Sequence, residues 1–194
     1  MLFAMRTARK MKAGYTLVEV LVVVSIMGIL SSIGVAGLQR AVAYARIKDS
    51  AMNTAAFMQR VADESTRLST VLCLKIEPGN PQRLWVVRDT IDEDCSRPSS
   101  GVVDQMELEP PSQFVVSKSN GCPVMQDWFG ANAKVAFKPR LGLSAAPPEG
   151  GICIRYGTKD IYGAVRKEKG RNKVVPMWKN GNDASANWDN WSEL

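Results

Sequence analysis

The sequence contains no histidine, the residue that most often serves as a general base or a metal ligand. Without it, no Ser-His-Asp or Cys-His catalytic arrangement can exist. The four cysteines show none of the C-x-x-C pairs that are typical of zinc sites. The acidic run Asp92–Asp94 lacks the alternating ligand spacing of a calcium loop. We therefore predict a protein that is not an enzyme and that uses no cofactor and no metal.

Charge is missing from one long stretch, the nineteen residues Val20–Leu38. As a helix this run would be about 28 Å long, close to the roughly 30 Å of a bilayer's hydrocarbon core. The basic residues before it place the N-terminus in the cytoplasm by the positive-inside rule, with the following domain outside. They supply four of the +6 formal charges, so the remaining +2 does not by itself imply a nucleic-acid partner. These residues are Arg6, Arg9, Lys10 and Lys12.

Proline is missing from residues 15–70, and apolar residues recur there at spacings of three, four or seven. This pattern predicts one long helix of about 80 Å, apolar in its first half and amphipathic in its second. A single small domain cannot cover such a helix, so much of it requires lipid or other subunits. The apolar positions expected on the second half are Leu38, Val42, Ala45, Met52, Ala56, Phe57, Val61 and Leu68.

The pattern changes to β-branched and apolar runs near Ser69. A hairpin is predicted from strands Ser69–Ile76 and Arg83–Asp89 around the turn Glu77–Gln82. The Asn-rich tail Lys179–Leu194 is expected to be irregular. The predicted fold class is α+β, with the long helix packed on a C-terminal antiparallel β-sheet head. Further strands are expected at Gln105–Leu108, Gln113–Ser117, Ala133–Lys138, Gly151–Tyr156, Asp160–Arg166 and Asn172–Trp178.

The stretch "GYTLVEVLVVVSIMGIL" resembles the class III signal of type IV pilins and type II secretion pseudopilins. The shared pattern is a basic leader ending in Gly14, an aromatic residue at Tyr15, and Glu19 just before an apolar helix. Two details depart from it, because Tyr15 replaces the commoner Phe and Ala36 stands where many pilins have a kinking proline. The resemblance covers about the first forty residues.

This resemblance implies cleavage between Gly14 and Tyr15 by prepilin peptidase, followed by N-methylation of Tyr15. A lone carboxylate in hydrocarbon is costly, so Glu19 needs a partner. The new amine of a neighbouring subunit would provide one and would favour assembly. The implied location is the bacterial inner membrane, which the chain would cross once. The subunit would leave the membrane when it is incorporated into a filament. The implied partners are the bilayer, prepilin peptidase, other minor pilins or pseudopilins, and the filament assembly platform.

The segment "AMNTAAFMQRVADESTRLSTVLCLKI" is similar to GspH/FimT-type minor pilins, in which the helix runs directly into a strand. This implies a minor subunit that acts in initiation or at the tip of a type II secretion pseudopilus or a type IV pilus; the sequence does not distinguish these two filaments. The expected organisation is a cleaved leader (1–14), a transmembrane and filament-core helix (15–38), its amphipathic continuation (39–69) and an extracytoplasmic head (70–194).

Four cysteines in an exported domain predict one or two disulfides, and three connectivities are open. Cys95 and Cys122 lie in polar, turn-rich segments, so we predict a disulfide between them. Cys73 and Cys153 lie in strand-like runs and are expected to be small buried residues without a bridge.

The segment "RKEKGRNK" is the one concentrated basic cluster outside the leader. Some FimT-like proteins bind DNA through a basic Gly-Arg loop, which makes a DNA-binding minor pilin for natural transformation the alternative function. Lysine, glycine and asparagine are equally expected in a solvated hairpin turn, and the sequence favours that interpretation. The candidate DNA ligands are Arg166, Lys167, Lys169, Arg171 and Lys173.

Overall fold

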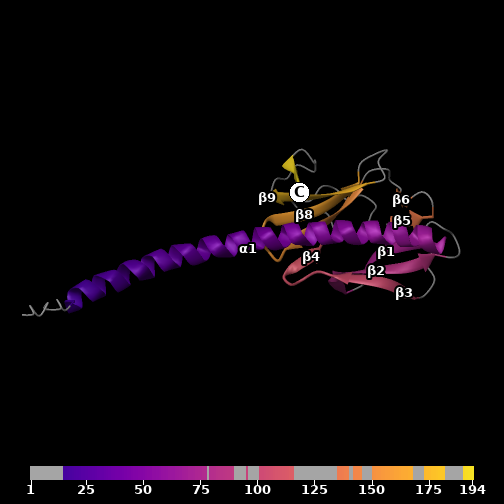
Figure 1. The fold of residues 1–194 in the computed structure, drawn as a ribbon. Coiled ribbons are helices and arrows are strands. Elements are labelled where there is room, and N and C mark those ends of the chain that lie inside the picture. The colour runs from indigo at the N-terminus through magenta and orange to yellow at the C-terminus, as the bar shows by residue number, and fades with distance from the viewer. Residues whose placement is uncertain are drawn as a thin grey trace, which may run out of the picture. The chain divides into compact units, whose positions relative to one another are not determined.

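The computed structural model describes residues 15–77, 79–89, 95, 101–115, 135–139, 142–145, 150–167, 173–181 and 190–194. The chain divides into two compact units, Met1–Ala41 and Val42–Leu194. Of the described residues, unit 1 holds the first part of the single long helix. Unit 2 holds the rest of that helix and ten strands (Figure 1).

The helix α1 spans Leu17–Leu68, a length of 52 residues, close to the predicted bounds. It ends because Ser69 adopts a left-handed conformation with a φ of 50°. The N–H of Ser69 donates to the carbonyl of Thr66 at 3.3 Å, and that of Thr70 donates to the carbonyl of Ser65 at 3.2 Å. This pair of bonds closes a helix in a Schellman motif.

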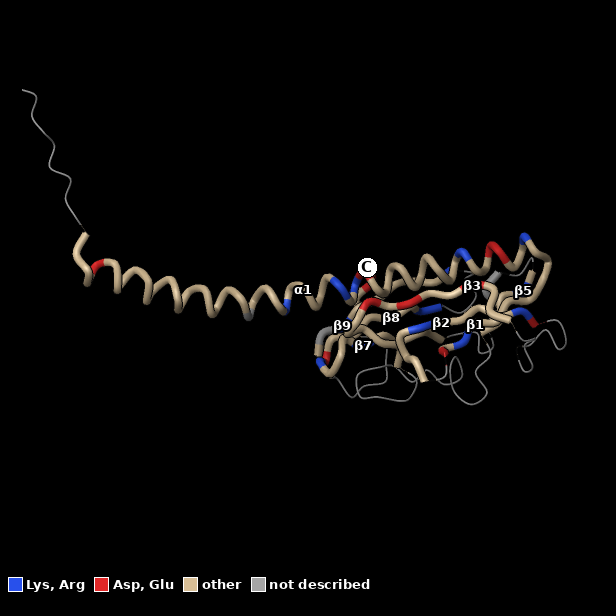
Figure 2. The backbone as a smooth tube through the Cα atoms, turned by 90° about the horizontal axis from the view of Figure 1, so that it is seen from below, with Lys and Arg blue, Asp and Glu red and all other residues tan. Residues whose placement is uncertain are grey.

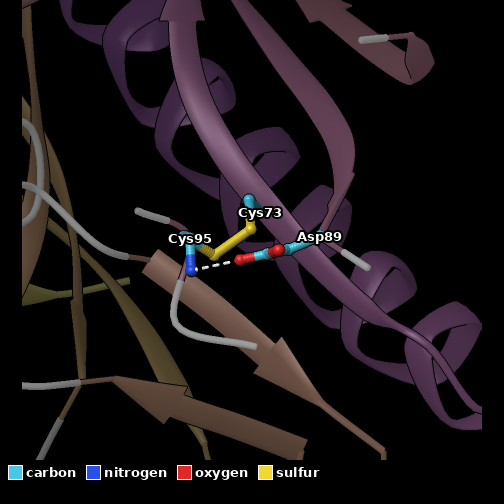
Figure 3. A group of neighbouring side chains, drawn as sticks. All are labelled: Cys73, Asp89 and Cys95. Carbon is cyan, nitrogen blue, oxygen red and sulfur yellow. Dashed lines mark hydrogen bonds between the residues drawn. A yellow bond between two sulfur atoms is a disulfide. The ribbon is translucent and has the colours of Figure 1, made fainter. Parts of the chain in front are cut away.

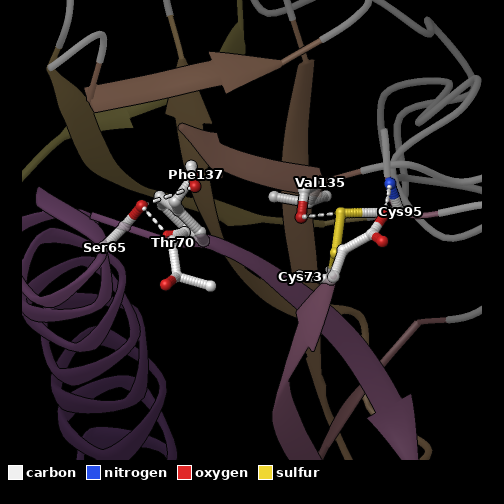
Figure 4. Close-up of a disulfide and its surroundings, with 7 residues drawn as sticks. Ser65, Thr70, Cys73, Cys95, Val135 and Phe137 are labelled. Carbon is white, nitrogen blue, oxygen red and sulfur yellow. Dashed lines mark hydrogen bonds between the residues drawn. A yellow bond between two sulfur atoms is a disulfide. The ribbon is translucent and has the colours of Figure 1, made fainter. Parts of the chain in front are cut away.

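The buried hydroxyl of Ser65 ties this last helical turn to two strands. It hydrogen-bonds to the carbonyl oxygen of Thr70 at 2.8 Å, next to strand β1 (Val71–Glu77). It also hydrogen-bonds to that of Phe137 at 2.6 Å, on strand β5 (Val135–Lys138) (Figure 4). The helix therefore passes into the first strand through a fixed turn.

Within the described residues, ten strands form two five-stranded antiparallel sheets. Sheet A has the order β3-β2-β1-β5-β6, and sheet B has the order β10-β9-β8-β7-β4. The remaining bounds are β2 Asn80–Asp89, β3 Val102–Glu107, β4 Ser112–Phe114, β6 Gly142–Ala145, β7 Gly150–Tyr156, β8 Ile161–Lys167, β9 Val174–Asn180 and β10 Ser192–Glu193.

The second half of α1 lies along both sheets, with β8 and β9 on one side and β1 to β3 on the other (Figure 1). One hydrophobic core joins Ile47 and Met58 of the helix to Leu72 of sheet A and Ile152 of sheet B. Alternate residues of β1 point away from this core, and Cys73 lies in a second buried cluster on the opposite face. Burial on both faces explains the continuous apolar character of β1.

The apolar positions expected on the second half of α1 do not all lie on the face that packs on the sheets. Phe57 and Val61 are buried there, but Val42 and Met52 are 39% and 47% exposed. The packed face instead consists mostly of small residues, with apolar and hydroxyl side chains intermixed. Its members are Ala43, Ile47, Ser50, Ala51, Thr54, Ala55, Met58, Val61, Ala62 and Ser65.

The small residues let the helix approach sheet B closely. At Gly163 of β8, an added Cβ would lie 3.0 Å from the Ile47 carbonyl oxygen and 3.3 Å from the Ala51 Cβ. These distances are shorter than ordinary contact, and the nearest atom belongs to the backbone. The close approach therefore requires glycine on the strand facing alanine on the helix.

The α+β prediction is confirmed, including the β1–β2 hairpin, in which Val71 pairs with Asp89. The predicted strands overlap β3, β4, β5, β7, β8 and β9. Two strands were not predicted. β6 pairs with β5 at one edge of sheet A, and β10 pairs with β9 inside the tail that was expected to be irregular. The sequence patterns also did not reveal that the strands divide into two sheets.

The predicted Cys95–Cys122 disulfide was wrong, because the structure joins Cys95 to Cys73 with a Cα–Cα distance of 5.6 Å (Figure 4). Cys73 points to the outer face of β1, where Cys95 packs beside it after the end of β2. A position in a strand therefore did not prevent cross-linking. Cys153 is also disulfide-bonded, contrary to expectation, and Cys122 lies outside the described residues.

We expect Gly163→Ala to destabilise unit 2 by about 1–3 kcal/mol, because the new methyl group must displace the Ile47 backbone. Denaturant unfolding of the full chain in detergent, followed by tryptophan fluorescence, measures this change. The matched control is Gly37→Ala, whose added Cβ meets nothing within 4 Å. Equal midpoints for the two variants would contradict the close approach.

Non-reduced peptide mapping should recover a cross-linked peptide that contains Cys73 and Cys95. Replacing both residues with Ala should lower the free energy of unfolding by about 2–4 kcal/mol, because the bridge closes a loop over a sequence separation of 22 residues. Recovery of Cys95 linked to Cys122 would instead restore the connectivity predicted from the sequence.

Candidate processing and assembly site

The start of α1 is closed by a side-chain cap. The backbone N–H of Glu19 donates to Oγ1 of Thr16 at 3.2 Å. Thr16 is therefore the N-cap, and Glu19 is the third helical residue. A threonine three residues before a glutamate is the sequence signature of a capping box, although only this half of the reciprocal pair is formed here. The spacing of Thr16 and Glu19 is thus a sequence signal from which the start of the helix could have been predicted.

Glu19 is the acidic residue of the first helical turn, and it is exposed. A carboxylate at this end of a helix interacts favourably with the unpaired N–H groups and the positive end of the helix dipole. None of the described residues donates a hydrogen bond or an ion pair to this carboxylate in the single subunit. Its position therefore leaves it available to a group from outside the described chain.

The helical surface that follows Glu19 is apolar and uncovered. An 18-residue window has a mean hydropathy of 2.3, and none of it is buried. The helix is long and apolar enough to cross a membrane. Its exposed large side chains up to residue 38 are Leu17, Val18, Val20, Leu21, Val22, Val23, Val24, Ile26, Met27, Ile29, Leu30, Ile33, Val35 and Leu38.

Within unit 2, a second set of exposed residues continues at helical spacing. Val42, Ala45, Met52 and Ala56 lie on the side of α1 opposite the face that packs on the sheets. The spacings of three, four and seven place them on one stripe. These residues are among the apolar positions expected on the second half of α1, and they form an outward surface. Asp49 lies in the same stripe, so this side of α1 exposes apolar side chains interrupted by one acid.

Residues 9–35 match the family model described as the prokaryotic N-terminal methylation motif. The N-terminus of this chain is type IV pilin-like. The match covers three of the four basic residues before Gly14, the aromatic residue at Tyr15, and Glu19 with most of the apolar run that follows it. No curated protein and no solved structure matches the chain.

The pilin-like N-terminus therefore combines a recognised motif with a capped, membrane-length helix. Tyr15 is exposed directly before the cap, and Gly14 lies outside the described residues. The cut expected after Gly14 would leave Tyr15 and Thr16 ahead of the first helical residue. A capped helix start so near the new amine holds both the amine and Glu19 at one end of α1.

The basic cluster is only partly described. Lys169 and Arg171 lie outside the described residues. Lys167 is buried, and this burial lowers the pKa of its ammonium group. Arg166 is half-buried, and of the three described members only Lys173 is exposed. The described part of the cluster therefore offers little surface to a phosphate backbone.

Residues of types that can bind metal ions lie together around the disulfide. The Cys95 N–H donates to a carboxylate oxygen of Asp89 at 2.6 Å, and that aspartate is 2% exposed (Figure 3). Ligand-type atoms of Cys73, Asp89 and Cys95 lie within 4.8 Å of one another. Because the two sulfurs are bonded to each other, they are not thiolate ligands. The group holds Cys95 in its left-handed conformation, with a φ of 64°.

We expect Thr16→Ala to speed hydrogen exchange at the Glu19 amide by about fivefold, because losing an N-cap costs about 1 kcal/mol. Exchange of the full chain in detergent micelles, resolved by NMR, measures this effect. Thr16→Ser keeps the hydroxyl and should exchange like the unmodified protein. Equal rates for the alanine and serine variants would show that the cap contributes nothing.

Proposed function

We propose that this chain is the precursor of a minor pilin or pseudopilin of the GspH/FimT type. In this proposal, prepilin peptidase cuts between Gly14 and Tyr15, Tyr15 is N-methylated, and the mature subunit joins a type II secretion pseudopilus or a type IV pilus. The observation that carries the proposal is the methylation motif, which overlaps a helix that is long and apolar enough to cross a membrane and whose 18-residue apolar window is not buried at all.

The uncovered apolar surface of α1 supports the proposal, because it suits a helix that passes from the bilayer into contact with other helices. Before assembly, the bilayer covers the residues between Glu19 and Arg40, with the N-terminus in the cytoplasm and the head outside. In a filament, helices of neighbouring subunits replace the lipid. The exposed stripe Val42–Ala56 extends the contact into the part of α1 that packs on the head. Its opposite face remains bound to the sheets, so assembly requires no unpacking of unit 2.

Glu19 would select the assembled state. In lipid its carboxylate is costly, and a neighbouring subunit's Tyr15 amine offers a charged partner inside the bundle. Among the described residues the carboxylate has no partner that would compete for it. The subunits would therefore align with each amine beside an adjacent acid, which sets their stagger along the filament.

A position in filament initiation or at the tip follows from the resemblance to minor subunits. DNA binding at a pilus tip is the alternative function, and it would depend on Lys169, Arg171 and the exposed Lys173. The burial of Lys167 weighs against a role for the whole cluster. We therefore favour assembly over DNA binding.

We expect Glu19→Ala to abolish incorporation of the subunit into sheared filaments while leaving Tyr15 as the mature N-terminus. The first effect follows from the loss of the acidic partner, and the second from an intact junction at Gly14. Immunoblotting of the filament fraction and mass spectrometry of the membrane fraction measure them separately. Glu19→Asp keeps the charge and serves as the matched control.

Filaments that contain the alanine variant at the unmodified level would overturn the proposed role of Glu19. A protein that keeps its first fourteen residues in cells with active prepilin peptidase would overturn the processing step. These outcomes are separate, because a cut subunit that never assembles would still support processing.

A further inference from the structure

Unit 2 carries aromatic and basic side chains at the end where α1 enters it. We call this group the proximal ring: Tyr44, Arg46 and Lys48 of α1, Tyr156 and Lys159 at the β7–β8 turn, and Trp178 of β9. Each is half-buried or exposed. Figure 2 marks the basic residues of the helix and of the turn in blue.

Short contacts tie the helical members of the ring to sheet B. The Lys48 Nζ lies 4.1 Å from the ring centroid of Trp178. Tyr44 meets the same indole edge-on, with centroids 5.9 Å apart. Trp178 is paired in register with Gly163, the residue that contacts Ile47. The indole is therefore held beside the first turns of α1 in unit 2.

The two ring residues at the β7–β8 turn, Tyr156 and Lys159, lie at the same end of unit 2. The Lys159 Nζ lies 5.8 Å from the ring centroid of Tyr156. The Gly157 N–H donates to the carbonyl of Pro111 at 3.0 Å. The carbonyl of the preceding Pro110 accepts a hydrogen bond from Arg46 at 3.4 Å. Three separate segments thus place their aromatic and basic side chains at one end of the sheets.

The ring's place along the chain relates it to the membrane. At 1.5 Å per residue, Tyr44, Arg46 and Lys48 follow the last apolar residue, Leu38, by about 9–15 Å of helix. The headgroup layer adds about 5–8 Å beyond the hydrocarbon on each side of a bilayer. Membrane insertion of α1 therefore places the ring a few ångströms outside the headgroup layer, within reach of it for long lysine and arginine side chains.

The charge at this end favours an anionic surface. Two nearby acids already have partners. Asp160 pairs with Arg155 at 3.4 Å, and Asp49 accepts a hydrogen bond from Asn53 at 3.0 Å. Glu109 and Glu193 are two further exposed acids near the ring, and Glu193 directly follows the residue that pairs with Trp178. Arg46, Lys48 and Lys159 have no acidic partner among the described residues, and Arg40 adds a fourth cation on the preceding turn of α1.

We propose that the proximal ring binds the headgroups of anionic phospholipids and docks the head on the membrane surface before assembly. This rests on the membrane anchoring in the proposed function, but not on processing or filament formation. Each lysine or arginine near such a surface strengthens the contact about fivefold, and salt weakens it. Docking would hold the subunit in a defined orientation, with the stripe Val42–Ala56 accessible to a neighbour.

The test uses the full chain, one copy per lipid nanodisc. Hydrogen exchange at the amides of residues 157–160 is compared in discs of pure phosphatidylcholine and in discs containing phosphatidylglycerol. We expect slower exchange with phosphatidylglycerol. The double variant Lys48→Gln, Lys159→Gln should weaken the docked state about 30-fold, because it removes two cations.

The matched control is Lys138→Gln, Lys173→Gln, which removes two lysines near the other end of the head. Lys138 ends β5 next to the Ser65 contact, and Lys173 precedes the pairing of Val174 with Lys167. This variant should keep the protection. Equal exchange in the two lipids, equal loss in both double variants, or protection that arises only in filaments would each overturn the proposal. The last outcome would assign the ring to a neighbouring subunit.

Discussion

The structure depends on one constraint, the incompatibility of the first half of α1 with water. Fourteen large apolar side chains from Leu17 to Leu38 remain exposed. Covering the exposed half of each is worth on the order of 1–1.5 kcal/mol, or on the order of 15–20 kcal/mol together. This exceeds the net stability of most folded domains, about 5–15 kcal/mol. The free energy of covering the apolar side chains of unit 1 is therefore larger than the free energy of folding of a domain such as unit 2. It decides where the protein resides.

The second half of α1 uses different residues on its two sides. Toward the sheets it presents mostly small side chains, and Gly163 lets the strand approach them. On the opposite side it presents Val42 and Met52, which the head leaves uncovered. In the proposed filament, attachment of the head and contact with other subunits would thus use separate faces of α1. Neither contact needs to be broken for the other to form.

The sequence predicted what local pattern determines and missed what depends on distant contacts. The long helix, the β1–β2 hairpin and the fold class follow from spacing and from the absence of proline. The spacing of apolar residues did not identify the packed face of α1, where Ala43, Ala51 and Ala55 are buried because they are small. The Cys73–Cys95 bridge depends on the outer face of β1, which no local pattern reveals. Glu19 was found from the sequence, but its cap at Thr16 was overlooked.

The Schellman turn at Ser69 has a mechanical consequence. Ser65 joins the last turn of α1 to both β1 and β5, and β1 starts two residues after the turn. A pull along the helix would therefore enter sheet A at its central strand, which is hydrogen-bonded on both sides. Force applied along a strand loads its whole ladder of bonds at once. A pull on the membrane helix of a subunit would thus move the head without unfolding it.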